Sequence, residues 1–272
     1  MLIKAKDDYD ELDYKPLVEP EWEAFRDGKA QEIGGVAFSH TKSPLVLING
    51  ATYVGGLDEL ETFAGTELGE ALAVADEKPY QKQAAEAILE AFRATGNSYC
   101  SMDVKIGDAK PRYIMFELYA GVCPRTCENF RLLCAGKTTH SGTGQLMTYK
   151  GTQIHRIVPD GWVQGGDFTG KGDAGESAFV GTFPDESFAV KFDKPGVLAM
   201  ACAGAHTNAS QFFITFAPLP WLNHKAVAFG RVVKGCGALR ALNKLETSNE
   251  RPVEAVTISG CQEIDLDRPL VS

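Results

Sequence analysis

The 272-residue chain lacks the usual features of membrane, secreted and metal-binding proteins. No apolar run approaches the roughly 18 residues that a membrane-spanning helix needs. The first residues contain no short apolar core of the kind that a secretory signal carries. The seven cysteines form no Cys-x-x-Cys pair and the five histidines are scattered, so neither a zinc site nor a disulfide framework is predicted. We therefore expect a cytoplasmic protein that binds no metal ion and does not enter a membrane.

A basic surface is also missing from the composition. Residues 1–96 contain 19 acidic and 9 basic side chains, whereas residues 97–272 contain 17 acidic and 18 basic ones. The formal net charge of −9 therefore comes from the first third of the chain. Binding to nucleic acid through its phosphates requires a basic face, so we expect no nucleic-acid partner.

The pattern of the first 96 residues predicts a small α/β region behind an acidic leader, residues 1–18. Asn49-Gly50 lies between two short apolar runs, where it favours a hairpin turn. Gly28 is expected to end the first helix, and the last helix is expected to link this region to the rest of the chain. The predicted elements are a helix over 19–28, strands over 45–48 and 52–54, and helices over 57–64 and 79–94.

From Tyr99 onward the pattern is typical of a β-sheet. Apolar side chains alternate with polar ones over 100–106, and several short apolar segments follow at intervals that suit a closed antiparallel barrel. Thr126 is expected to cap a helix that Gly136 ends, and a second helix is predicted over 238–245. The further strands are predicted over 114–118, 197–201, 211–216, 227–233 and 253–259.

The strand–turn–strand order of the first region, with Ser43-Pro44 before it and Gly55-Gly56 after it, resembles the second half of a thioredoxin domain. Residues 1–99 contain no cysteine, however. Thiol transfer needs a thiolate, so that activity is excluded for this region whatever its fold.

Several segments of the β-rich region form a pattern from about Tyr99 to Gln262, and they include PRTCENF at 124–130, IHRIVP at 154–159, QGGDF at 164–168, GVLAMA at 196–201, NASQFFI at 208–214 and VAFG at 227–230. In order and spacing these segments resemble the cyclophilins, a family of peptidyl-prolyl cis-trans isomerases. The resemblance implies a mainly β fold, a closed eight-stranded antiparallel barrel capped by two helices. The implied domains are an acidic leader at 1–18, a degenerate thioredoxin-like region with its linker helix at 19–96, the isomerase domain at 97–264 and a tail at 265–272.

Two further segments narrow the resemblance. Asp160-Gly161-Trp162-Val163-Gln164 and Asn249-Glu250-Arg251-Pro252 are similar to those of divergent isomerase-like members, in which a thioredoxin-like region precedes the barrel.

The chemistry of the reaction explains why an arginine is expected at the site. Partial double-bond character gives an X–Pro amide a barrier of about 18–20 kcal/mol to rotation. A fixed cation that donates to the prolyl nitrogen stabilises the twisted amide, and arginine always carries its charge and a rigid set of donors. The resemblance assigns the catalytic role to Arg156, and Gln164 to holding the substrate carbonyl and supporting the arginine. The implied substrate-binding residues are Trp162, Ala201, Cys202, Ala203, Gln211, Phe213, Trp221 and Leu222.

The sequence departs from the family at the proline pocket. Gly161 and Trp162 stand where a phenylalanine and a methionine are usual, and Ala226 replaces a histidine. Trp162 either replaces the lost wall or leaves a wider pocket. We expect an isomerase of reduced activity that needs no cofactor, acts on proline-containing peptides and client proteins in folding or switching, and is inhibited by cyclosporin. The alternative is a module that binds proline peptides with little or no turnover.

Overall fold

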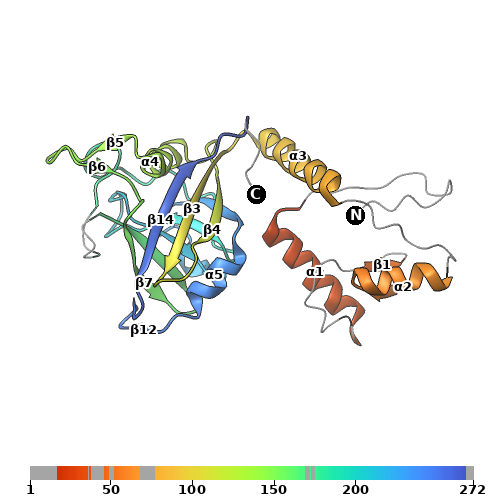
Figure 1. Cartoon of the computed structure of the whole chain (residues 1–272). Coiled ribbons are helices and arrows are strands. Elements are labelled where there is room, and N and C mark those ends of the chain that lie inside the picture. Colours follow the sequence, from red (N-terminus) through yellow and green to blue (C-terminus); the bar gives the residue numbers. More distant parts are fainter. Residues whose placement is uncertain are drawn as a thin grey trace. The chain divides into compact units, whose positions relative to one another are not determined.

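The computed structural model describes residues 17–35, 37, 46–48, 52–67, 77–168, 172 and 175–267. The chain divides into two compact units, Met1–Leu89 and Glu90–Ser272 (Figure 1). The division falls inside helix α3 (Glu77–Thr95), the helix that the sequence predicts as a linker. Among the helices of the described residues, none is long and apolar enough to cross a membrane.

The first unit contains the short elements that its pattern predicts. They are α1 (Glu19–Ile33), β1 (Val46–Ile48), β2 (Thr52–Gly55) and α2 (Leu57–Glu67). The two strands pair antiparallel, with Ile48 opposite Thr52. The expected end of α1 at Gly28 is wrong, because the helix continues to Gly34, where a φ of 69° stops it. The Asn49-Gly50 turn and Ser43-Pro44 lie outside the described residues.

The second unit is built on a closed barrel of eight antiparallel strands, which confirms the predicted fold. Around the barrel the strands follow the order β10, β8, β7, β14, β3, β4, β11 and β9. Their bounds are β3 (Ser98–Ile106), β4 (Arg112–Leu118), β7 (Gln153–Val158), β8 (Trp162–Asp167), β9 (Val197–Met200), β10 (Phe212–Thr215), β11 (Ala228–Lys234) and β14 (Val256–Glu263). Closure leaves no unpaired sheet edge in the barrel.

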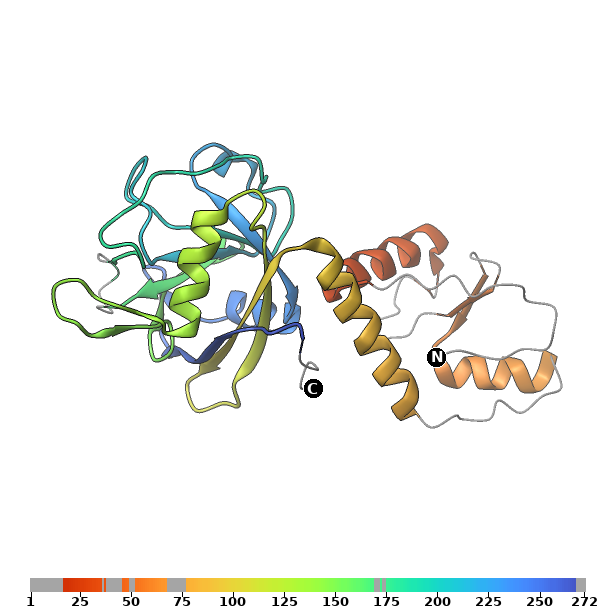
Figure 2. The same ribbon diagram turned by 90° about the horizontal axis from the view of Figure 1, so that it is seen from above.

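Smaller elements complete the second unit. Figures 1 and 2 show helices α4 (Pro124–Ala135) and α5 (Cys236–Asn243) over opposite ends of the barrel. The remaining elements are the hairpin of β5 (Thr138–Thr139) with β6 (Leu146–Met147), the hairpin of β12 (Thr247–Ser248) with β13 (Arg251–Pro252), and the 3-10 helix η2 (Pro220–Leu222).

Phe130 of α4 lies at the centre of the barrel core. Its side chain is fully buried, and its ring meets four other aromatic rings at centroid distances between 5.2 and 5.8 Å. Those rings belong to Phe116, Tyr149, Phe212 and Phe229. Aromatic pairs at these distances stabilise a fold beyond the apolar area they bury. The helix is therefore part of the core and closes that end of the barrel.

Two local expectations are corrected by long-range contacts. Thr126 does not cap α4, because the helix begins at Pro124 and the carboxylate of Glu186 accepts hydrogen bonds from the backbone N–H groups of Arg125 and Thr126 at 2.9 and 2.8 Å. The last strand begins at Val256, three residues later than predicted. The preceding Val253 is exposed and donates its N–H to the carbonyl of Glu246, the residue before β12.

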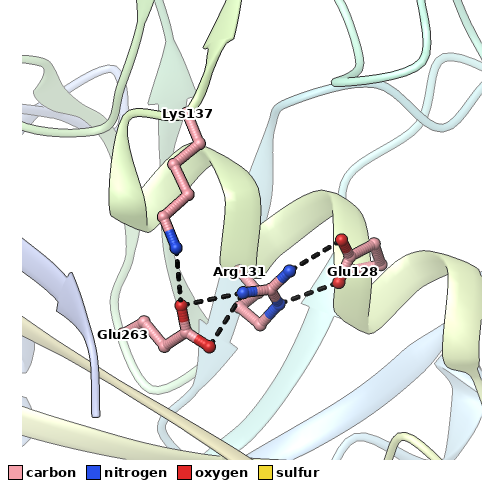
Figure 3. A network of polar contacts seen from close by, with 4 residues as sticks. All are labelled: Glu128, Arg131, Lys137 and Glu263. Carbon is pink, nitrogen blue, oxygen red and sulfur yellow. Dashed lines mark hydrogen bonds and ion pairs between the residues drawn. The ribbon is translucent and has the colours of Figure 1, made fainter. Parts of the chain in front are cut away.

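An ion-pair network joins α4 to β14 (Figure 3). The Arg131 guanidinium donates to both carboxylate oxygens of Glu128 and to both of Glu263, at 2.7 or 2.8 Å in each case. Lys137 adds a contact to Glu263 at 3.2 Å. Paired contacts of this kind are stronger than single ones because the fork of the guanidinium matches a carboxylate. The network therefore fixes helix α4 against strand β14.

Replacing Arg131 with methionine should lower the free energy of unfolding by about 1–2 kcal/mol, because a bidentate, partly buried arginine contributes more than an ordinary surface ion pair. Urea unfolding at pH 7 measures this loss. The exposed Lys110→Met variant, which removes the same charge in the β3–β4 turn, should change the free energy by less than about 0.5 kcal/mol.

The same comparison has a defined pH dependence. Hydrogen bonds from Arg131 hold the pKa of Glu128 below its ordinary value of 4.5. A lowered pKa in the folded state means that the stabilisation is complete above pH 4.5 and is lost as the pH falls through the folded-state pKa. The difference between wild type and Arg131→Met should be full at pH 6 and should shrink below pH 4.5. A difference that stays constant down to pH 3 would contradict this account.

Candidate functional site

The register of three neighbouring strands brings the main predicted residues into one row. Arg156 of β7 lies opposite Gln164 of β8, and Gln164 lies opposite Phe213 of β10. Side chains of directly paired residues lie on the same face of a sheet. Their neighbours Val163 and Phe212 point into the barrel and are almost fully buried. The row of Arg156, Gln164 and Phe213 therefore lies on the outside of the barrel.

Arg156 is held on two sides. Its Nε donates to Oε2 of Glu250 at 2.7 Å, and its guanidinium carbon lies 5.2 Å from the centre of the Trp162 ring. Among the described residues, its two Nη groups have no hydrogen-bond partner. The guanidinium is thus oriented through its Nε edge, while the Nη edge is left to donate to a ligand.

Gln164 forms hydrogen bonds with Trp162 and Gln211, and none of its described contacts is a hydrogen bond to Arg156. Its Oε1 accepts a hydrogen bond from Nε1 of Trp162 at 3.3 Å, and its Nε2 donates to Oε1 of Gln211 at 2.9 Å. Gln211 in turn donates to the carbonyl of Gly172 at 3.3 Å. The expected support of Arg156 by Gln164 is replaced, within the described residues, by the contact with Glu250. A primary amide has two N–H donors, and the described residues accept only one of those of Gln164.

The apolar part of the site is made by aromatic side chains. The Trp162 ring lies 5.9 Å from that of Phe213 and 6.0 Å from that of Trp221. Phe213 stacks on Phe192 and is only 5% exposed, whereas Trp221 of η2 is 54% exposed. Leu222 packs with Trp162 against the same buried cluster. Trp162 thus occupies the position of a wall between Arg156 and the apolar cluster.

The residues that depart from the family lie around this wall. A Cβ atom at Gly161 would come within 3.0 Å of the Val158 side chain, so this turn position has little space for a larger residue. Ala226 is buried in the apolar cluster and leaves the pocket border to Trp162 and Leu222. The site therefore differs from the family pattern by a rearranged wall and not by a missing one.

Three of the implied substrate-binding residues, Ala201, Cys202 and Ala203, directly follow the end of β9. The N–H of Ala201 donates to the carbonyl of Gln211 at 3.0 Å, which places both beside Phe213. Cys202 and Ala203 line a cavity of about 500 Å³ together with Asp185, Phe188, Gly204, Ala205, His206, His224 and Lys225. Burial raises the pKa of the Cys202 thiol, which makes a nucleophilic role unfavourable. Cys202 therefore lines this cavity without presenting an activated thiolate.

One residue beside the site was not assigned a role from the sequence. Glu250 appears there only as part of a segment that resembles certain relatives, yet it is the hydrogen-bonding partner of Arg156. The sequence feature that could have drawn attention to Glu250 is its position directly after Asn249, where a tight hairpin turn favours glycine. Taken by itself, the described part of the second unit contains no group of three His, Cys, Asp or Glu side chains that is close enough to hold a metal ion.

A closed antiparallel barrel with helices over both ends, and an outer face that presents an arginine beside amides and aromatic rings, defines the cyclophilin class of domain. Residues 101–263 match the family described as cyclophilin type peptidyl-prolyl cis-trans isomerase/CLD. The chain therefore belongs to the cyclophilin-type peptidyl-prolyl cis-trans isomerase family.

Several relatives are similar over most of the chain. A human (Homo sapiens) protein named probable inactive peptidyl-prolyl cis-trans isomerase-like 6 is 38% identical over 248 residues, which cover 90% of this chain and 78% of that protein. Its counterparts of the same name from Bos taurus and Mus musculus are 36% and 35% identical, again over 90% of this chain and over 80% and 78% of their own lengths. The similarity extends into the first unit, because 90% of the chain is more than the second unit, Glu90–Ser272, contains.

The position of Trp162 can be tested by its contribution to stability. Replacing a fully buried Trp or Phe with alanine costs about 3–5 kcal/mol, so the half-buried Trp162 should cost about 2 kcal/mol as Trp162→Ala. Trp162→Phe retains a smaller aromatic ring without the indole N–H and should cost less than the alanine variant, about 1 kcal/mol. Urea unfolding gives these values, with Trp221→Ala as the exposed control at about 0.5 kcal/mol. Equal costs for the two alanine variants would show that the Trp162 ring does not pack against the cluster.

Proposed function

We propose that this protein is a peptidyl-prolyl cis-trans isomerase of reduced rate, which binds X–Pro segments of peptides and client proteins on the outer face of β7, β8 and β10. The observation that carries the proposal is the arrangement of Arg156. Its guanidinium lies in one row with Gln164 and Phe213, and its Nη groups have no hydrogen-bond partner among the described residues. Family membership supports the same reaction.

Each part of the X–Pro segment is bound by a different group of the site. The proline ring rests on the Trp162 and Phe213 rings and on Leu222. The remaining Nε2 hydrogen of Gln164 holds the carbonyl of the residue before the proline. An Nη group of Arg156 donates to the prolyl nitrogen as the amide twists and its lone pair is released from resonance. No bond is made or broken, so a positioned cation and a closely fitting surface are enough.

The expected rate follows from the size of the altered contacts. Five decades of catalysis require about 7 kcal/mol of transition-state stabilisation, at about 1.4 kcal/mol for each decade. One apolar contact contributes about 1.5–3 kcal/mol, so a rearranged wall that makes one contact fewer with the proline ring would cost one or two decades. The names of the relatives describe them as probably inactive, which is consistent with a low rate and equally with the second candidate below.

A peptide with one X–Pro bond tests the enzyme directly. Wild type should catalyse its isomerisation above the uncatalysed rate, and Arg156→Ala should lose at least tenfold in kcat/KM because the variant lacks the guanidinium that donates to the prolyl nitrogen. Arg112→Ala, which removes an exposed arginine of β4 outside the site, should keep the wild-type rate. Wild type and Arg156→Ala both at the uncatalysed rate would contradict the enzyme.

A second candidate is a proline-peptide-binding module with little or no turnover. The ion pair between Arg156 and Glu250 favours it, because a cation already bound to a carboxylate is a weaker donor to an amide nitrogen. NMR titration with the same peptide separates the two candidates. Binding without exchange between the cis and trans forms would support the module, and exchange cross-peaks would support the enzyme.

Cyclosporin provides a separate test of the binding surface. The exposed Trp221 offers an indole N–H at the rim of the site, and losing a hydrogen bond to a ligand carbonyl costs about 1–3 kcal/mol. We expect measurable binding by calorimetry, and a loss of at least tenfold in affinity for Trp221→Ala, with much of the isomerase activity retained. No heat at tens of micromolar with a folded wild type would show that the Trp162 ring or the adjacent loop blocks the drug.

A further inference from the structure

The turn that carries Glu250 is unusual for its residue type. In the hairpin of β12 and β13, Ser248 lies opposite Arg251, which leaves Asn249 and Glu250 as a two-residue loop. Their φ angles are 51° and 64°. Such turns favour Asn-Gly, because glycine has no Cβ atom to crowd the backbone at positive φ. Asparagine tolerates this conformation well, whereas glutamate does not. The second position therefore carries a strained residue where glycine would be relaxed.

Two hydrogen bonds hold this strained residue against β7. The carbonyl of Glu250 accepts from the N–H of Ile157 at 2.7 Å, and its Oε2 accepts from Nε of Arg156 at 2.7 Å. Backbone and side chain of one residue thus bind two consecutive residues of the strand. Local strain that persists at a functional site is held there by its surroundings and points to a role for the strained residue. The only side-chain contact that the strain secures, among the described residues, is the one with Arg156.

The contact changes the arginine in two ways. Together with the face of Trp162 at 5.2 Å, it restricts the guanidinium to one orientation. The carboxylate charge at 2.7 Å also lowers the positive potential that the guanidinium presents to other acceptors. A prolyl nitrogen is a neutral and weak acceptor, so its stabilisation in the twisted amide depends on that potential. A carboxylate on the arginine therefore opposes the reaction while leaving the apolar binding surface intact.

We infer that Glu250 is a positioning residue that acts through Arg156 and lowers the turnover of bound X–Pro segments. The inference rests on the proposed isomerase function. The rate is then lowered by the carboxylate bound to Arg156 as well as by the shape of the pocket. Both side chains are partly exposed, at 41% for Arg156 and 44% for Glu250, so the effect operates under partial screening by water and salt.

Two variants separate charge from strain. Glu250→Gln keeps the size of the side chain, an acceptor for Nε and the strained backbone, but removes the charge. Glu250→Gly removes the charge, the contact and the strain. Both should raise kcat by threefold to tenfold on an X–Pro peptide, with KM changed by less than twofold. Glu246→Gln removes the same charge from an exposed position before the same hairpin and should leave both constants unchanged.

The outcomes are distinct for the inference and for the proposed function. A wild type that catalyses the reaction and variants that match it, or fall below it, would overturn the inference alone. A gain in Glu250→Gly without one in Glu250→Gln would also overturn it, because strain and not charge would then set the rate. Wild type and both variants at the uncatalysed rate would overturn the proposed function together with the inference.

A readout without substrate completes the experiment. In an NMR spectrum of ¹⁵N-labelled protein, the Nε–H signal of Arg156 should exchange slowly with water in the wild type, because a carboxylate accepts it. The signal is assigned by its loss in Arg156→Lys. Its exchange should be at least several-fold faster in Glu250→Gly than in wild type or Glu246→Gln. Equal exchange in all three would show that the contact is not populated in solution and would overturn the inference. Thermal unfolding confirms that each variant is folded.

Discussion

The pairing of β8 with both β7 and β10 is the constraint on which the whole candidate site depends. Side chains alternate between the two faces of a strand, so the register that buries Val163 and Phe212 also places Arg156, Gln164 and Phe213 outside. A shift by one residue would turn the arginine into the apolar interior, where an unpaired charge is very costly. Closure of the barrel fixes this register, because every strand is paired on both sides. The chemistry of the outer face is therefore a consequence of how the inner face packs.

The parts of the structure that the sequence predicts are those set by local pattern. Alternating apolar residues over 100–106 and the apolar segments that follow are enough to indicate a barrel, and the family resemblance orders its strands. Contacts between distant residues are not visible in such patterns. Glu186 caps α4 from about 60 residues away, and Glu250 reaches Arg156 across 94 residues. Val253 looks like the start of the last strand because it is apolar, yet the hairpin keeps it exposed.

In the candidate site, too, the sequence indicates the residues that lie in the strands but not the contacts that come from distant segments. The register brings Arg156, Gln164 and Phe213 together as the resemblance implies, and their roles stay predictions until activity is measured. The partner of the arginine could not be inferred, because a glutamate in a turn ordinarily indicates only an exposed loop. What distinguishes Glu250 is its positive φ, a property of the folded hairpin and not of the residue type. A sequence shows which residue occupies the turn, while the structure shows that the turn is strained and where its carboxylate points.

These features suggest how a cyclophilin barrel can change its turnover without changing its fold. Phe130 and the rings around it form the interior, and none of the residues that depart from the family lies among them. Trp162 and Ala226 belong to a separate cluster on the outer face, and Glu250 belongs to a hairpin outside the barrel. Substitutions at these positions do not disturb the packing around Phe130, so they can alter the site while the barrel core is kept. Arg156 binds a carboxylate through Nε, while its Nη groups have no hydrogen-bond partner among the described residues, so the guanidinium stays accessible as a donor with a weakened charge. The two candidate functions thus differ in how strongly one ion pair weakens one donor, and not in the architecture that holds them.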